Sequence, residues 1–146
     1  MNIRTVCGLL LDACGLSGLA YGFWNLWHAL TSPKWPSVNG EIAASCLQRN
    51  RDADGMVTYR AGVTYRYQVA GQAHTSDRVF FGDRLAVGWA SAAVRRVDKH
   101  PPGSVVRVYY DPHQPARAVL EPGNLWHVLA ILLFSALFLG SGIALL

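Results

Sequence analysis

The sequence predicts an α+β membrane protein in which a two-helix transmembrane hairpin carries an inserted, mainly antiparallel β domain, a small barrel or sandwich with one helix. Apolar stretches stand at both ends of the 146 residues, nearly all charged residues lie between them, and the middle contains a period-two alternation. The expected divisions are residues 5–30 for the first transmembrane helix, 31–123 for the extramembrane domain and 124–146 for the second helix.

The C-terminal helix is the clearer of the two spans. Residues 128–146 contain no charged side chain, and two serines are their only hydroxyl groups. Because a helix rises ~1.5 Å per residue, about 20 residues cross the ~30 Å hydrocarbon layer of a bilayer. This segment is therefore long enough to span a membrane.

The N-terminal stretch is less purely apolar, because it contains Asp12, Asn25 and His28. A cleaved signal peptide, or a lipoprotein signal ending at Cys14, is the alternative to a membrane helix. The apolar run before Asp12 is short and apolar sequence continues beyond Cys14, so a retained helix is favoured. The three cysteines of the chain form no disulfide framework.

Three tryptophans mark the expected membrane surface. Trp24 and Trp27 lie near the end of the first helix, and Trp126 opens the second. The amphipathic indole prefers the headgroup layer, where an apolar ring meets a polar partner. Because a hairpin brings these two helix ends to the same side, we expect all three residues to be membrane-interface anchors.

Small residues indicate the contact faces of the two helices. In lipid no hydrophobic force drives helix association, so close approach of backbones at small residues takes its place. We expect the helices to pack on each other, on a second copy or on another membrane protein. The expected positions are Gly8, Asp12, Gly15, Gly18 and Gly22 in the first helix and Ala136, Gly140 and Ala144 in the second. Asp12, the one charge inside the membrane, is either a structural hydrogen-bonding group or a functional residue.

The polar middle of the chain is expected to fold in the order β-β-β-α-β-β. Its clearest signal is residues 57–69, where apolar and polar side chains alternate as in a strand with one buried and one solvated face. Apolar residues spaced by three and four over residues 83–99 instead predict a helix. The remaining expected elements are strands at 38–47, 72–81, 105–110 and 118–120, with turns at 50–55 and 70–71.

Four short motifs follow one another through this domain. Gly71 follows a YxYxV strand, VFFG occupies 79–82, PGxxVxVxYDP occupies 102–112, and AVLEPG occupies 118–123. With these motifs the chain resembles, over residues 35–123, a widespread bacterial membrane-protein family of unassigned function. Members of that family place such a strand-rich domain between two transmembrane helices. The resemblance implies architecture and supplies no catalytic residue.

The sequence contains no recognisable motif for catalysis or for binding a metal or cofactor. The five histidines show no HxH or HxxxH spacing, and there is no CxxC pair, GxSxG elbow or phosphate-binding glycine loop. Asp111 stands at a turn, where aspartate is expected to cap the backbone rather than act as a base. We therefore expect no catalytic residue, no metal and no cofactor.

The charge distribution gives no indication of nucleic-acid binding. The formal net charge is +4 and no run of Lys or Arg occurs, so no nucleic-acid partner is expected. Arg95, Arg96 and Lys99 share one face of the expected helix, which is either an ordinary solvated face or a contact with lipid headgroups or an acidic partner. The positively charged N-terminal tail favours cytoplasmic termini and a periplasmic domain, at the bacterial inner membrane.

These observations favour a non-enzymatic, membrane-anchored interaction protein, an accessory subunit or adaptor of a membrane assembly. The alternative is an immunity protein that neutralises a secreted antibacterial toxin at the inner membrane. A ligand-sensing or enzymatic domain is the third hypothesis, and it requires a polar pocket that sequence does not reveal. The expected partners are the lipid bilayer and either another membrane protein or a second copy of the chain.

Overall fold

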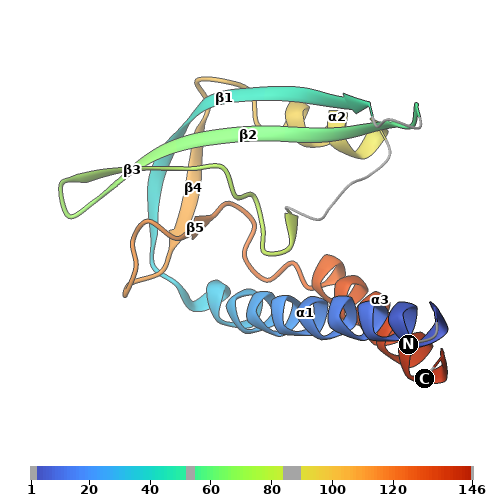
Figure 1. Ribbon diagram of the computed structural model, residues 1–146. Helices are drawn as coiled ribbons and strands as arrows, with labels where there is room; N and C mark the ends of the chain where they lie inside the picture. Colours follow the sequence, from blue (N-terminus) through green and yellow to red (C-terminus); the bar gives the residue numbers. More distant parts are fainter. Residues whose placement is uncertain (1–2, 52–54, 84–89, 146) are drawn as a thin grey trace.

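The computed structural model describes residues 3–51, 55–83 and 90–145. Two long helices lie against each other below an open β-sheet, and both ends of the chain lie together (Figure 1). Helix α1 (Ile3–Thr31) leads into the 3-10 turn η1 (Ser32–Lys34), and α3 (Trp126–Leu145) returns beside α1. Both helices are long and apolar enough to cross a membrane, and most of that apolar surface is exposed.

The sheet is antiparallel and has the strand order β3-β2-β1-β4-β5. The expected α+β class with two flanking helices is therefore confirmed, but the sheet is open and is neither a barrel nor a sandwich. Closure of a sheet into a barrel depends on pairing between strands far apart in the chain. The alternation of apolar and polar residues along one strand does not report such pairing. The elements between the helices are β1 (Ser37–Arg51), β2 (Val57–Val69), β3 (Gln72–Ser76), α2 (Ala90–Lys99), β4 (Val105–Tyr110) and β5 (Ala118–Val119).

Several elements end elsewhere than expected. Strand β1 continues to Arg51 rather than stopping at residue 47, because its second half pairs with β2 as far as Val57. Strand β3 ends at Ser76 rather than at 81, and beyond it the carbonyl of Val79 accepts backbone hydrogen bonds from the segment that follows β5. Residues 84–89 of the expected helix and 52–54 of the expected turn lie outside the described residues.

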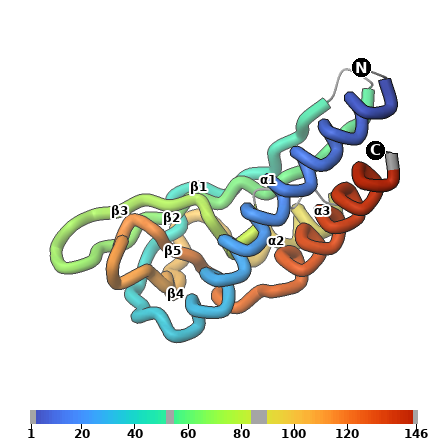
Figure 2. The backbone as a smooth tube through the Cα atoms, turned by 60° about the horizontal axis from the view of Figure 1, so that its bottom comes forward, coloured from blue at the N-terminus to red at the C-terminus, as the bar shows by residue number. Residues whose placement is uncertain are grey.

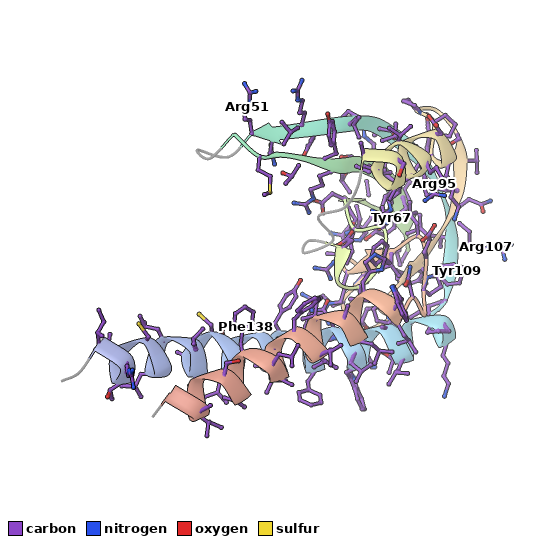
Figure 3. All side chains as sticks on the ribbon, turned by 90° about the vertical axis from the view of Figure 1, so that its right-hand side faces the viewer. Arg51, Tyr67, Arg95, Arg107, Tyr109 and Phe138 are labelled. Atoms are coloured by element: carbon purple, nitrogen blue, oxygen red, sulfur yellow. The ribbon has the colours of Figure 1, made fainter. Side chains whose placement is uncertain are left out.

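The sheet divides into two parts at an irregularity between Ile42 and Ala44 of β1. Before it, β1 also pairs with β4, and the end of β2 pairs with β3. Beyond it, residues 43–51 and 57–64 form a two-stranded segment, here called the β1–β2 arm, with α2 packed against it. The arm extends in the same direction as the two helices (Figures 1, 2 and 3).

The domain has two apolar clusters, and the adjacent Phe80 and Phe81 belong to different ones. Phe80 lies in the core of the sheet. Phe81 packs with Val119 of β5 and Val128 of α3, which joins the sheet to the helices. Gly82 follows with a φ of 90°, a left-handed conformation that favours glycine. The second cluster therefore fixes the domain on the ends of the helices.

Candidate functional site

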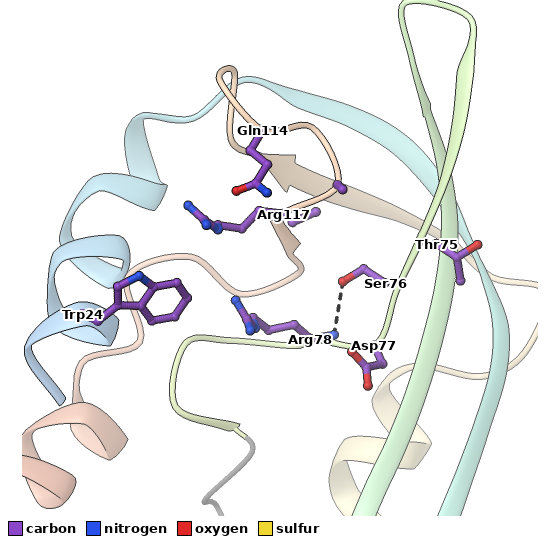
Figure 4. A pocket seen from close by; sticks show the side chains of 9 residues that line it. Trp24, Thr75, Ser76, Asp77, Arg78, Gln114 and Arg117 are labelled. Atoms are coloured by element: carbon purple, nitrogen blue, oxygen red, sulfur yellow. Dashed lines mark hydrogen bonds between the residues drawn. The ribbon is translucent and has the colours of Figure 1, made fainter. Parts of the chain in front are cut away.

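A cleft of about 340 Å³ lies where the domain meets the end of α1 (Figure 4). Three segments line it: Trp24 on α1, residues 75–78 at the end of β3 and just beyond it, and residues from 114 to 118, which lead to the start of β5. The guanidinium groups of Arg78 and Arg117 both point toward Trp24 (Figure 4). Their central carbon atoms lie 5.6 and 5.3 Å from the centre of its ring.

Arg117 is held by a histidine and a carboxylate. Its Nη1 donates hydrogen bonds to Nε2 of His28 at 2.8 Å and to Oδ2 of Asp111 at 3.2 Å. The Nδ1 atom of His28 lies 2.8 Å from the carbonyl oxygen of Trp24, so it is the nitrogen that carries the proton. Nε2 is then an acceptor and the ring is neutral. The buried His28 thereby connects α1 to the domain.

The loop between β4 and β5 presents Asp111 to Arg117. The backbone N–H of Asp111 donates to the carbonyl of Arg117 at 2.9 Å, and Oδ1 of Asp111 accepts the backbone N–H of His113 at 2.9 Å. Asp111 therefore caps its turn, as the sequence predicts, and uses its second oxygen for the ion pair. The two side chains are only 12% and 26% exposed, so the pair is better shielded from water than a surface salt bridge.

Arg78, on the other side of the cleft from Arg117, is held by aromatic rings rather than by a histidine and a carboxylate. Its guanidinium carbon lies over Trp24 and 5.2 Å from the centre of the Phe81 ring, so two aromatic faces stabilise its charge. Among residues 3–51, 55–83 and 90–145, no carboxylate forms an ion pair with this guanidinium. The carboxylate of Asp77 has an interaction of its own and points away from both arginines (Figure 4).

Two buried tyrosines of β2 position the arginine-bearing segments. The hydroxyl of Tyr65 donates to the carbonyl of Arg78 at 2.7 Å, and that of Tyr67 donates to the carbonyl of Pro115 at 2.6 Å. Burial raises the pKa of both hydroxyls, so both remain protonated donors. The alternation in residues 57–69 thus places in the core the side chains that hold two walls of the cleft.

The α1 positions expected to form the helix contact lie against α3. A Cβ atom added to Gly15 would come within 2.9 Å of the backbone nitrogen of Leu139. One added to Gly22 would come within 2.5 Å of a methyl group of Leu132. The other expected positions, Gly8, Asp12 and Gly18, lie on the same face, the first two against Gly142 and the third against Ser135.

The positions expected on α3 do not form this contact. Ala136, Gly140 and Ala144 are exposed, and a Cβ atom added to Gly140 would meet nothing within 4 Å. Helix α3 instead places Leu132 and Leu139 in the hollows that the glycines leave on α1, and its own small residues at the contact are Ser135 and Gly142. Contact of the exposed face with a partner stays a prediction.

The basic face expected on α2 is partly used within the molecule. Lys99 forms an ion pair with Glu121, and the guanidinium carbon of Arg96 lies 4.8 Å from the centre of the Phe80 ring. Arg95 is exposed (Figure 3). Contact of this face with headgroups or a partner therefore stays a prediction. Of the three residues, Arg95 is the most available for it.

The three expected membrane anchors differ in their surroundings. Trp27 and Trp126 are 68% and 77% exposed, as a side chain in the headgroup layer requires. Trp24 is only 40% exposed, and its ring centre lies 4.2 Å from that of His28, beneath the two arginines of the cleft. Trp24 is therefore a wall of the cleft, a role that its position near a helix end did not indicate.

Sequence patterns do not single out the polar residues of this site. A signal for His28 exists, because Asn25, His28 and Ser32 are polar side chains spaced by three and four at the end of an apolar helix, and all three are buried. Arg78 and Arg117 stand in loops without periodicity. Within the part of the chain that the structure describes, no group of three His, Cys, Asp or Glu side chains is placed to hold a metal ion.

Residues 38–125 match the model of a protein family described as "Domain of unknown function (DUF3592)". No protein of curated function matches the chain. The matched segment runs from β1 to the residue before α3, so it includes Arg78 and Arg117 of the cleft but not Trp24 or His28 of α1. Since the match covers more than half of the chain, the protein belongs to the family described as Domain of unknown function (DUF3592).

Proposed function

We propose that this protein is a non-enzymatic, membrane-anchored interaction protein, an accessory subunit or adaptor of a membrane assembly. The position of the β1–β2 arm relative to the helices carries the proposal. Arg51, at the end of β1, has the same position along the direction of the helices as Phe138 of α3, and in Figure 3 it lies directly above Phe138. At ~1.5 Å per residue, Phe138 lies about 18 Å along α3 from Trp126. A hairpin that spans the bilayer therefore brings the end of the arm to the depth of the lipid.

Hydrocarbon is an unfavourable neighbour for this arm. Among the described strands, none pairs with the outer edge of β1 beyond Glu41 or of β2 before Tyr65. Arg49 and Arg51 are also exposed. Open sheet edges do not face hydrocarbon, and a charged side chain there costs roughly 3 kcal/mol. A protein partner that covers the arm removes both costs, and it can do so by adding a strand to the open edge.

The domain is tied to the helices closely enough to hold the arm in this place. Arg117 bonds to His28 of α1, and the hydroxyl of Ser32 accepts the backbone N–H of Gly123 at 3.2 Å. Phe81 adds the apolar contact with α3. A partner that binds the arm is therefore held beside the helices, as a subunit of a membrane assembly is.

The proposal also covers which membrane the protein spans and on which side of it the domain lies. The N-terminal tail carries Arg4 and the terminal amine ahead of an apolar run, which favours retention of the tail in the cytoplasm. The protein is then a multi-pass protein of the bacterial inner membrane with its domain in the periplasm.

Crosslinking tests the proposal. Cys46 lies on the arm and is exposed. In a variant with Cys7→Ala and Cys14→Ala, a photoactivatable reagent on Cys46 should trap a membrane protein in native membranes. The matched control carries its single thiol at Gln72, which is exposed at the start of β3, and should trap that protein far less. Absence of a protein adduct at Cys46, or equal adducts from both sites, contradicts the proposal. A secreted toxin in the adduct selects the immunity-protein alternative.

A further inference from the structure

The cleft at the end of α1 carries an excess of positive charge that the proposed function does not use. Arg78 and Arg117 both approach the same indole ring, where their like charges repel each other. Asp111 compensates Arg117. Within the described ranges no carboxylate forms a direct ion pair with Arg78; two aromatic faces and a longer-range attraction to Asp83 stabilise its guanidinium. An anion placed between the two arginines would stabilise both charges.

The walls of the cleft supply hydrogen-bond donors for such an anion. Arg117 uses Nη1 for its bonds to His28 and Asp111, which leaves the other N–H groups of its planar fork. Ser76 is already engaged within this wall, because its Oγ accepts the backbone N–H of Arg78 at 3.4 Å and its side chain hydrogen-bonds the Tyr65 hydroxyl (Figure 4). Gln114 adds an amide (Figure 4). Two guanidinium groups with an amide donor beside them suit the many acceptor oxygens of a phosphate.

The cleft lies at the level where phosphates of a membrane are found. Trp24 is one helical turn before Trp27, whose exposed ring is suited to the headgroup layer, and the exposed Trp126 opens α3. The volume of about 340 Å³ falls at the lower end of the range of small-molecule sites, roughly 300–1,000 Å³. That space suits a headgroup rather than a whole lipid.

We infer that this cleft binds a phosphate group and that the source of the phosphate is the headgroup of an anionic phospholipid in the adjacent leaflet. Arg78 and Arg117 hold the phosphate oxygens, and Trp24 forms the wall toward the helix. Tyr65 and Tyr67 are positioning residues, because they act only through the segments that carry the arginines. The inference rests on the membrane placement in the proposed function and not on a protein partner of the arm.

Lipid binding to the intact protein, purified in detergent, tests the inference. The probes are phosphatidylglycerol, phosphatidylcholine as the zwitterionic comparison, and inorganic phosphate as the soluble comparison. We expect phosphatidylglycerol to bind most tightly and to raise the Tm. Arg78→Gln leaves the Arg117–Asp111 pair intact and should lower the affinity for phosphatidylglycerol about tenfold or more. Arg107→Gln removes the same charge from an exposed position of β4 and should bind as the wild type does (Figure 3).

Each outcome bears on the inference. Arg78→Lys keeps the charge but loses the planar fork, so an affinity between those of the wild type and Arg78→Gln supports it. Equal affinity of Arg78→Gln and the wild type, with an unchanged Tm in the absence of lipid, overturns it. If inorganic phosphate binds and raises the Tm but phosphatidylglycerol does neither, the lipid is not the source of the phosphate. The cleft is then a site for soluble phosphate. Because none of these measurements involves Cys46, failure of the arm to crosslink a partner is distinguishable from failure of this inference.

Discussion

Arg117 and His28 are joined by a hydrogen bond of 2.8 Å between Nη1 and Nε2, although 89 positions separate them in the chain. The bond joins the loop before β5 to α1. The ring of His28 can accept it only in the neutral form, because Nδ1 already donates to the carbonyl of Trp24. His28 of α1 therefore serves to dock the domain, together with the contact of Phe81 with α3.

Replacement of His28 by Phe should lower the stability of the domain by about 1–3 kcal/mol. Phe keeps a ring between Trp24 and Phe81 but leaves Nη1 of Arg117 without one of its two acceptors. Chemical unfolding of the purified protein in detergent measures the loss. His113→Phe is the control, because His113 is exposed and its bond to Asp111 uses only the backbone. An equal loss in both variants contradicts the docking role of His28.

Replacement of Tyr65 by Phe should destabilise the domain at neutral pH and should cost progressively less at alkaline pH. At neutral pH the variant loses the bond to the carbonyl of Arg78 and with it about 1–3 kcal/mol. Burial raises the pKa of the Tyr65 hydroxyl in the folded state. The stability linked to such a group is fully present below its unfolded pKa of about 10 and is lost as the pH rises above that value.

The wild type should therefore lose stability above about pH 10 more steeply than Tyr65→Phe does, and the two stability curves should converge. Unfolding free energies measured from neutral to alkaline pH give this comparison. Curves that stay parallel throughout contradict a buried, protonated Tyr65 hydroxyl.

The contrast between strand β2 and the cleft shows what a sequence pattern can predict. In β2, Val63, Tyr65 and Tyr67 are buried while Arg66 is exposed, as the alternation indicates. Over residues 57–62 all side chains are half-buried, because the arm has no further strand on either side there. A local period identifies a strand, but it does not report how many neighbours the strand has.

The cleft depends on contacts that have no local signal. Tyr65 bonds to a carbonyl 13 positions away and Tyr67 to one 48 positions away, and these long-range bonds help to bring the two arginine-bearing segments together. Helix contacts are an intermediate case. The glycines of α1 lie at the contact, but the repeat of small residues on α3 lies outside it, since large side chains can fill the hollows that glycines leave.

Thiol labelling tests the proposed periplasmic side of the domain. A single cysteine at Gln72, in an otherwise cysteine-free protein, is exposed and lies on β3, outside the β1–β2 arm. We expect a membrane-impermeant maleimide to label it in intact spheroplasts. A single cysteine at Ile3, 80% exposed at the start of α1, should react only after the membrane is opened. The reverse pattern contradicts a periplasmic domain.

Two glycines of α3 provide a matched test of the helix contact. Gly142 is buried, and a Cβ atom there would overlap the carboxylate of Asp12 and lie 2.9 Å from the carbonyl oxygen of Gly8. Gly140 faces open space. Because both are glycines of the same apolar helix, substitution by Leu changes helix propensity and lipid solubility alike in the two variants.

Gly142→Leu should therefore destabilise the hairpin by about 1–3 kcal/mol, as overpacking of a close contact does, while Gly140→Leu should leave its stability unchanged. Thermal unfolding in detergent and proteolysis of the helix ends measure this difference. Co-purification from native membranes adds a second readout, because the exposed face with Ala136, Gly140 and Ala144 is the one expected to meet a partner. If Gly140→Leu keeps the stability of the wild type but loses a co-purifying protein, that face binds the partner. Equal destabilisation by both substitutions contradicts the α1–α3 contact described here.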